Sequence, residues 1–168
     1  MNTYEQDFSD PSGDSAEALS RDAIQVRSML ETDLPAMVSI DRKLNGTGEA
    51  RTRYYEGKLA EVLGESGVRV SLVAEVDGAF AGFIMARVDY GEYGRTAPSA
   101  VLDTIGVEPA FQGRAVGRML MRQLLANLAC LNVETLYTRT DWNDHDTLAF
   151  FEAAGFEPAQ RLSFQRAL

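Results

Sequence analysis

Residues 101–118 read VLDTIGVEPAFQGRAVGR. The first seven residues have the apolar and β-branched character of a strand, the strand ends at Pro109, and small residues then open a helix-forming segment. The first amide groups of a helix have no intrahelical acceptor, and the helix dipole favours negative charge at that end. The stretch therefore predicts a cradle for a phosphate or pyrophosphate, and with it a phosphate-bearing cofactor.

Other interpretations of this loop can be weighed from the same residues. It lacks the Gly-Lys-Ser/Thr ending of a P-loop and the three-glycine spacing of a dinucleotide-binding fold, so neither of those phosphate sites is indicated. Gly113 and Gly117 also fit a purely structural role in packing or in a tight turn, and this alternative stays open.

The pattern on either side of the loop predicts a mixed α/β architecture. Asp77-Gly78 lies between two alternating apolar runs and is a hairpin signal, because both residues tolerate positive φ angles. Thr32 reads as a helix N-cap, and Gly155 marks the end of a later helix. Helices are expected at 33–44, 49–63, 115–130 and 144–154, and strands at 24–29, 70–76, 80–88, 100–107, 135–140 and 162–168.

Composition indicates a single folded domain at 23–168. The chain has 168 residues, of which 45% are hydrophobic, and these can bury a sizeable core. Residues 1–22 carry six acidic residues and one arginine, with few apolar residues, and are expected to be a disordered acidic tail. The chain shows neither a secretory signal nor an apolar run long enough to span a membrane, so a cytoplasmic protein without membrane contact is expected.

Charge and metal-ligating residues exclude several function classes. A formal net charge of -9 argues against nucleic-acid binding and favours a cationic or neutral acceptor. Cys130 is the only cysteine and is expected in the core, so no intramolecular disulfide forms. His145 is the only histidine and is expected on the surface, so no metal site is predicted.

The run from Gln112 to Gly117 resembles the acetyl-CoA signature of the GCN5-related N-acetyltransferases, Gln/Arg-x-x-Gly-x-Gly/Ala. Residues 105–111 resemble the strand and turn that precede this signature in the family, and residues 150–156 resemble its later helix ending in Gly-Phe. The likeness extends over about residues 24–168. It implies an α/β fold with a six- or seven-stranded mixed sheet flanked by about four helices, and acetyl-CoA as co-substrate.

The resemblance also implies roles for individual residues. Backbone groups of Ile105 and Val107 would pair with the pantetheine arm of the cofactor, and the amides from Gln112 to Arg118 would hold the pyrophosphate. Arg114 and Arg118 either add charge-assisted contacts or remain solvated surface residues. The cofactor-binding residues implied in this way are Ile105, Gly106, Val107, Gln112, Gly113, Arg114, Ala115, Val116, Gly117, Arg118, Asn143 and Phe150.

Three positions depart from the family pattern. Ala115 stands where the fourth signature residue is usually glycine, and Asp144, beside Asn143, stands where the family has asparagine. Phe151 replaces the tyrosine that often protonates the departing thiolate, so a general acid must come from elsewhere or from water.

Two residues are the candidates for catalysis. Asp103 lies near the end of the strand before the cradle and could accept the proton of the attacking amine; the alternative is a solvent-facing or sheet-edge charge. Tyr93 is the candidate replacement acid, and Tyr90 and Glu92 in the same loop are candidates for substrate contact. A backbone N–H near Val107 would stabilise the oxyanion.

These inferences predict an N-acetyltransferase that transfers an acetyl group from acetyl-CoA to a primary amine by direct attack in a ternary complex. The acceptor stays open among a small amine, an amino acid, a protein lysine and a protein N-terminus. The alternative is a catalytically weak acyl-CoA-binding or regulatory module, suggested by Phe151. Pairing of relatives through late strands implies a possible homodimer.

Overall fold

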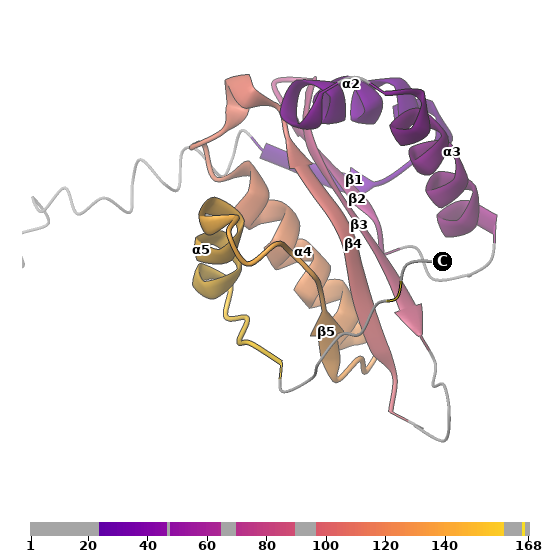
Figure 1. Cartoon of the computed structure of the whole chain (residues 1–168). Coiled ribbons are helices and arrows are strands. Elements are labelled where there is room, and N and C mark those ends of the chain that lie inside the picture. The colour runs from indigo at the N-terminus through magenta and orange to yellow at the C-terminus, as the bar shows by residue number, and fades with distance from the viewer. Residues whose placement is uncertain (1–23, 47, 65–69, 90–96, 160–165, 167–168) are drawn as a thin grey trace, which may run out of the picture. The chain divides into compact units, whose positions relative to one another are not determined.

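A computed structural model describes residues 24–46, 48–64, 70–89, 97–159 and 166 (Figure 1). In this part of the chain five strands form one mixed sheet in the order β1-β2-β3-β4-β5. The first four strands are antiparallel neighbours, and β5 runs parallel to β4. The strands are β1 (Ile24–Ser28), β2 (Leu72–Val76), β3 (Ala79–Asp89), β4 (Ser99–Val107) and β5 (Thr135–Tyr137).

Helices cover both faces of this sheet (Figure 1). The helices α2 (Leu34–Asn45) and α3 (Glu49–Gly64) lie on one face, and α4 (Val116–Cys130) lies on the other. The helix α4 follows β4 directly through the short 3-10 turn η2 (Pro109–Phe111). Helix α4 turns its apolar stripe inward, with Val116, Leu120, Met121, Leu124 and Leu128 buried.

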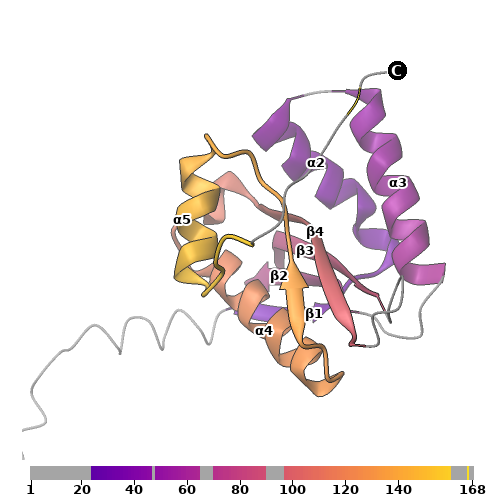
Figure 2. The ribbon, with the colours of Figure 1, turned by 60° about the horizontal axis from the view of Figure 1, so that its bottom comes forward.

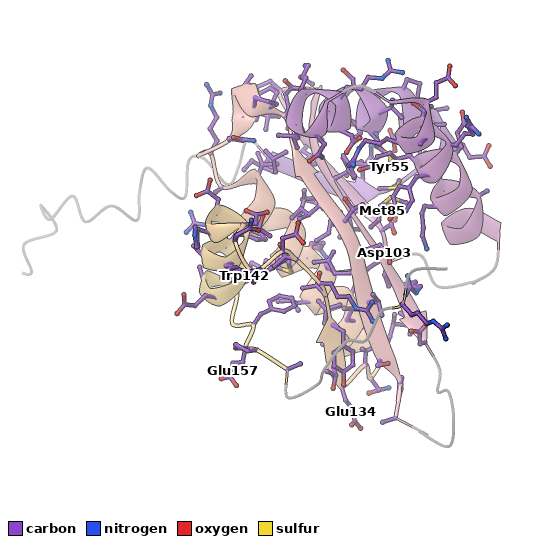
Figure 3. All side chains as sticks on the ribbon, in the orientation of Figure 1. Tyr55, Met85, Asp103, Glu134, Trp142 and Glu157 are labelled. Atoms are coloured by element: carbon purple, nitrogen blue, oxygen red, sulfur yellow. The ribbon has the colours of Figure 1, made fainter. Side chains whose placement is uncertain are left out.

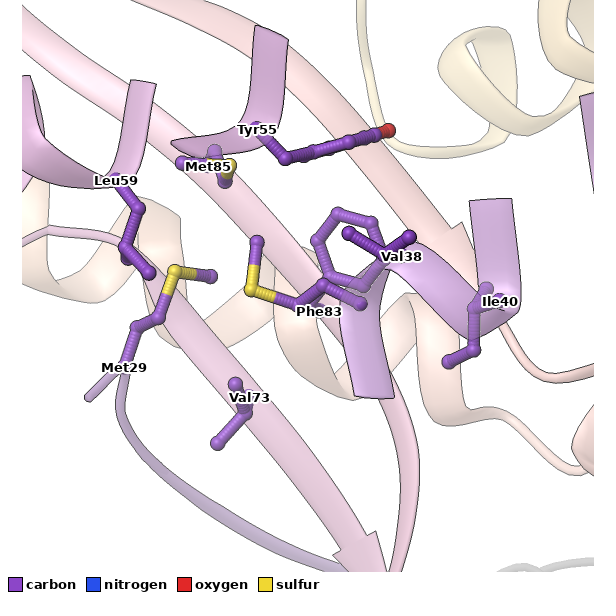
Figure 4. Packing of buried hydrophobic residues seen from close by; sticks show 9 residues of the cluster. Met29, Val38, Ile40, Tyr55, Leu59, Val73, Phe83 and Met85 are labelled. Atoms are coloured by element: carbon purple, nitrogen blue, oxygen red, sulfur yellow. The ribbon is translucent and has the colours of Figure 1, made fainter. Parts of the chain in front are cut away.

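One hydrophobic core cluster lies between the sheet and the pair α2 and α3 (Figure 4). Phe83 on β3 is the largest fully buried side chain, and Tyr55 of α3 meets its ring edge-on, with 5.8 Å between ring centroids. Around this pair pack Met29, Met37, Val38, Ile40, Leu59, Val73 and Met85. Burial of these side chains fixes which face of each strand α2 and α3 cover.

The tight turn between β2 and β3 confirms the hairpin prediction. Asp77 has φ 51° and Gly78 has φ 76°, which are the two positive angles that such a two-residue turn requires. The order of strands and helices matches the expected one through α4 and β5.

Several predicted details were wrong. Thr32 lies inside the 3-10 turn Glu31–Asp33 rather than capping α2, because Asp33 occupies the N-cap position. Cys130 is exposed, because it lies two residues beyond the buried Leu128 and so faces away from the sheet. The described sheet has five strands where six or seven were expected; the expected strand at 162–168 falls almost entirely outside the described residues and stays a prediction.

Strand β5 is three residues long where six were expected, because its pairing with β4 ends at the pair Val101 and Tyr137. Figure 2 shows β5 as a short arrow beside β4. From Thr138 onward the chain forms a separate compact unit that contains α5 (His145–Ala153). In the stretches of chain that the structure describes, no helix combines the length and apolar character needed to cross a membrane.

Candidate active site

The end of β4 presents an open backbone edge. β5 pairs with Ser99–Val101 of β4, and residues 103–107 have no strand partner on that side within the described sheet. The Glu108 amide donates to the Ala81 carbonyl oxygen of β3 over 2.9 Å. Because successive residues of a strand point their backbone groups to opposite sides, Ile105 and Val107 direct theirs toward the open edge. An extended, amide-bearing ligand could pair there as an added strand.

Gln112 closes part of this edge. Its side-chain Nε2 donates to the carbonyl oxygen of Val107 over 3.3 Å and so ties the loop to the strand. Gly106, between the two outward-facing residues, is glycine for a packing reason. A β-carbon there would lie 2.7 Å from the ring of Phe83. Among the predicted cofactor residues, Gly106 therefore allows β4 to pack closely against Phe83.

The loop of residues 112–115 leads from η2 to the start of α4, which has no side-chain cap. Gly113 has φ 75° and Ala115, at the N-cap of α4, has φ 63°. The Met119 amide donates to the Ala115 carbonyl over 2.9 Å, and the amides of Val116 and Gly117 precede it in the first turn of α4. The N-cap offers no side-chain acceptor and the first turn has no acidic residue. This arrangement can bind an anion through backbone N–H groups.

Arg114 and Arg118 add positive charge at this end of α4, and both are exposed. The Arg114 guanidinium lies over the ring of Phe111, 5.7 Å from its centroid. The structure therefore brings the predicted residues from Ile105 to Arg118 into one continuous segment made of the open strand edge and the helix start.

Asp103 lies at a β-bulge on the opposite side of β4 from this edge. Met85 of β3 pairs with Thr104 and the next residue, Ala86, pairs with Leu102, so Asp103 is the extra residue. On the other side of β3 the Ser71 hydroxyl fixes Ala86, accepting from its amide over 3.1 Å and donating to its carbonyl over 3.2 Å. Because of the bulge, Asp103 and its neighbour Thr104 both face α3. Lys58 of α3 lies near Asp103, and Tyr55 of α3 interacts with Thr104.

Two cations engage the carboxylate of Asp103. Figure 3 labels Asp103 on β4. Arg87 on β3 donates from Nη1 to Oδ1, and the Nζ of Lys58 on α3 lies 3.9 Å from Oδ2. The Asp103 side chain is only 11% exposed. It is therefore held in one position, with its charge balanced, rather than standing as a free charge at a sheet edge.

An ion pair between an exposed arginine of α3 and a buried carboxylate of α2 ties these two helices together. Asp41 of α2 accepts hydrogen bonds from Arg51 Nε over 2.5 Å, Arg51 Nη2 over 2.6 Å, Asn45 over 2.9 Å and the Tyr55 hydroxyl over 3.0 Å. The bond from Arg51 is the main reason that the pKa of Asp41 lies below its usual range. Burial raises the pKa of Tyr55 to about 12, so its hydroxyl stays protonated as a donor.

Sequence patterns did not reveal the partners of Asp103. The cross-strand register and the bulge bring Arg87 of β3 to Asp103, and the position of α3 over the sheet brings Lys58 there. Neither residue stands in a motif, so no signal in the sequence could have identified it. The same holds for Ser71, whose function here depends on the bulge.

The remaining predicted residues lie in the C-terminal unit or outside the described residues. Asp144 caps α5 by accepting from the Thr147 amide over 3.1 Å, and this hydrogen bond lowers its pKa. Asn143 is exposed in the turn before it. Phe151 is buried, with its ring 5.6 Å from that of Phe150 and 5.1 Å from that of Phe156. It therefore serves the core of this unit.

The predicted acid Tyr93 and its neighbours Tyr90 and Glu92 fall outside the described residues. Within the part of the chain that is described, no three histidine, cysteine, aspartate or glutamate side chains gather as metal ligands.

The mixed sheet, the open β4 edge and the uncapped start of α4 are the features expected of an acyl-CoA-dependent transferase. The family model described as "Acetyltransferase (GNAT) family" matches residues 26–156, and the chain belongs to this family. It is an N-acetyltransferase that uses acetyl-CoA as co-substrate and an amine as acceptor.

Two curated relatives are similar in sequence. A [ribosomal protein bS18]-alanine N-acetyltransferase of Salmonella typhimurium is 29% identical over 128 residues, covering 76% of this chain and 77% of the relative. An N-alpha-acetyltransferase RimI of Mycobacterium tuberculosis is 41% identical over 86 residues, and the match spans about half of each chain, 51%.

Solved structures share the fold. The aminoglycoside N-acetyltransferase AAC(6')-Iy in complex with CoA superposes with a TM-score of 0.71 at 21% identity, covering 86% of this chain and 94% of that one. Glucosamine-6-phosphate N-acetyltransferase from Arabidopsis thaliana has a TM-score of 0.67 at 13% identity, covering 85% and 97%. At these identities the likeness concerns the fold alone.

Proposed function

We propose that this enzyme acetylates the α-amino group at the N-terminus of a protein, with both substrates bound together. The observation that carries the cofactor part is the open edge of β4 that leads directly into the uncapped start of α4. The acceptor part is supported by the two relatives similar in sequence, both named as N-acetyltransferases of a terminal amine or alanine.

Acetyl-CoA lies along the chain segment from β4 to α4 in this proposal. The amides of the pantetheine arm pair with the outward-facing backbone groups of Ile105 and Val107. The pyrophosphate accepts hydrogen bonds from the first amides of α4, where the dipole and the guanidinium groups of Arg114 and Arg118 favour negative charge. Asn143 and Phe150 stay proposed as cofactor contacts, as the family resemblance implies.

Acetyl transfer then needs a neutral amine and a stabilised oxyanion. The amine nitrogen attacks the thioester carbonyl carbon, and a backbone N–H near Val107 stabilises the oxygen that becomes negative. Asp103 takes the proton released from the amine, directly or through one water molecule. The C–S bond breaks as the amide forms, and Tyr93 or water protonates the thiolate of CoA.

Charge favours a cationic acceptor. The chain carries a formal net charge of -9, which attracts basic peptides and increases their rate of encounter. A protein N-terminus surrounded by lysine and arginine fits this charge, whereas an anionic small amine does not.

A panel of acceptors tests the proposal. Three acceptors are compared: a basic peptide with a free N-terminal alanine, the same peptide with a blocked N-terminus and a free lysine, and an aminoglycoside. Release of CoA thiol and mass spectrometry of the product report the reaction. We expect acetylation of the free α-amine at a kcat/KM at least about tenfold above the other two, a difference of about 1.4 kcal/mol in transition-state binding. Preferential acetylation of lysine or of the aminoglycoside would reject the acceptor assignment.

The second candidate is a catalytically weak acyl-CoA-binding module. It is favoured by Phe151, which cannot donate a proton and is buried between other aromatic rings. If acetyl-CoA raises the melting temperature but no amine in the panel releases CoA thiol between neutral and alkaline pH, this candidate is correct and the transfer mechanism above is not.

A further inference from the structure

Gly82 lies at the point where β3 supports both parts of the proposed cofactor site. It is buried, and in the antiparallel register it stands opposite Val107, the last residue of β4. Its neighbour Ala81 accepts the hydrogen bond from the Glu108 amide that anchors the end of β4. No cofactor role follows for Gly82 from the sequence motif, because it lies about 30 residues before the signature.

The space beside Gly82 is filled by atoms from the strand end and from the helix start. A β-carbon at this position would lie 2.8 Å from the carbonyl oxygen of Gly106 and 3.2 Å from Cγ1 of Val116. It would also lie 3.4 Å from Cδ1 of Leu120, one turn further along α4. The first distance is too short for any real β-carbon, and the atom in the way belongs to the backbone, so β4 itself would have to move.

These contacts connect Gly82 to the geometry that the cofactor requires. Gly106 lies between the two residues whose backbone faces the open edge, and Val116 is the first residue of α4. Both elements approach β3 at the same place because β3 has no side chain there. The separation between the strand edge and the helix start is therefore set, in part, by the absence of a β-carbon at residue 82.

We propose that Gly82 is a positioning residue for acetyl-CoA, which keeps the open edge of β4 and the first turn of α4 at the separation that one cofactor molecule spans. This inference rests on the proposed placement of the cofactor on that segment. Gly82 itself touches no cofactor atom in this proposal; it acts through Gly106 and Val116.

The contrast with Gly106 makes the position of Gly82 specific. A β-carbon at Gly106 would meet Phe83 and Ile40 on the face covered by α2 and α3. A β-carbon at Gly82 would meet only the strand end and α4 among its three nearest contacts. Alanine at residue 82 therefore disturbs the side of the sheet where α4 packs.

The test compares Gly82→Ala with Val73→Ala in the full-length protein. Val73 is fully buried on β2, in the core cluster under α2 and α3, so its truncation destabilises the fold away from the cradle. We expect both variants to lower the melting temperature by about 3–10 °C. Isothermal titration with CoA is expected to show a Kd raised on the order of tenfold for Gly82→Ala and changed less than about twofold for Val73→Ala.

Hydrogen exchange of the unliganded proteins gives a second readout. Exchange at the Glu108 amide is expected to speed up in Gly82→Ala relative to Val73→Ala at matched global stability, because the strand end has shifted. If Gly82→Ala does not fold in plain buffer, both measurements are made for all proteins in concentrated sucrose, which favours the folded state.

The outcomes separate this inference from the proposed function. A wild-type protein that fails to bind CoA rejects the cofactor placement itself. A wild-type protein that binds CoA, together with a Gly82→Ala variant that binds it equally well, overturns only the role of Gly82.

Discussion

The two sides of β4 are built by different means. The open edge and the start of α4 consist of backbone amides and carbonyls, shaped by glycine and alanine at positive φ. The face toward α3 consists of charged side chains, in which Asp103 is held by Arg87 and Lys58. The first side therefore depends on the path of the chain, and the second depends on which side chains the fold brings together.

This difference explains why the sequence suggests a role for one side and is silent on the other. A backbone site needs small residues at fixed spacing, and Gln112 to Gly117 carry that spacing in the sequence itself. A site of side chains from β3, α3 and β4 leaves no such local pattern. Changes that act on only one side should then affect only cofactor binding or only turnover.

The largest expected effect is on turnover. Asp103→Asn keeps the size of the side chain and removes its ability to accept a proton, so kcat should fall about 10²-fold or more while the Kd for CoA stays nearly unchanged. Steady-state kinetics and calorimetry measure the two quantities.

Asp89→Asn is the matched control for that substitution. Asp89 also pairs with Arg87, at 3.9 Å, but lies at the far end of β3. The kcat of the Asp89→Asn enzyme should remain close to that of the wild type. An Asp103→Asn enzyme as active as this control would remove Asp103 from the mechanism.

On the backbone side, Gly117→Glu introduces an anion into the first turn of α4. Repulsion of the pyrophosphate should raise the Kd for CoA on the order of tenfold or more. Ala126→Glu adds the same charge to an exposed position near the other end of this helix and should leave the Kd close to wild type. Equal affinity in the two variants would mean that the loop is structural and does not hold the phosphates.

A smaller effect is expected at Tyr55 of α3, whose hydroxyl donates a hydrogen bond to Asp41 of α2. Burial raises the pKa of Tyr55 to about 12, above its value of about 10 in an unfolded chain. The native state then keeps a proton that the unfolded state loses, so Tyr55 reduces the free energy of unfolding between about pH 10 and 12 and not below. At pH 8 the free energy of unfolding of Tyr55→Phe should be about 1 kcal/mol below that of the wild type, because Asp41 loses a hydrogen-bond donor.

Urea unfolding at several pH values measures this dependence. Tyr55→Phe should show a shallower loss of stability between pH 10 and 12 than Tyr54→Phe, whose ring is exposed. Parallel curves for the two variants would argue that Tyr55 ionises as readily in the folded protein as in the unfolded chain.

The smallest effect is expected at Ala115. Its φ of 63° is unfavourable for alanine and costs about 1–2 kcal/mol, whereas glycine tolerates this angle but gives up about 0.5–1 kcal/mol of unfolded-chain entropy. Ala115→Gly should therefore raise the melting temperature by about 1–4 °C. Calorimetry that finds a lowered melting temperature would show that the angle is not a source of strain.

Much of the fold could be predicted because its signals are local. Asp77 and Gly78 form the expected turn, and the apolar spacing from Val116 to Leu128 gave the buried stripe of α4. The extent of β5 could not be predicted in this way. Its residues suit a strand through Thr140, and only the loss of pairing with β4 ends it at Tyr137.

The candidate site divides in the same manner. Residues Ile105 to Arg118 run from the end of β4 into the first turn of α4, as the strand and helix patterns predicted, and their contact with a cofactor stays a prediction. The bulge that turns Asp103 toward α3 arises from a register shift between two strands, which no single stretch of sequence records. Gly82 is a similar case, because its importance depends on two elements that meet it from other parts of the chain.

The central claim is that backbone groups of the β4 edge and the α4 start bind acetyl-CoA. The most direct measurement is a titration of the isotope-labelled protein with CoA, followed by the shifts of individual amide resonances. The largest shifts should occur at Ile105, at Val107 and at the amides from Gly113 to Arg118, with small shifts at α2 and α3. Saturable binding with shifts concentrated elsewhere, and none in this segment, would contradict the account.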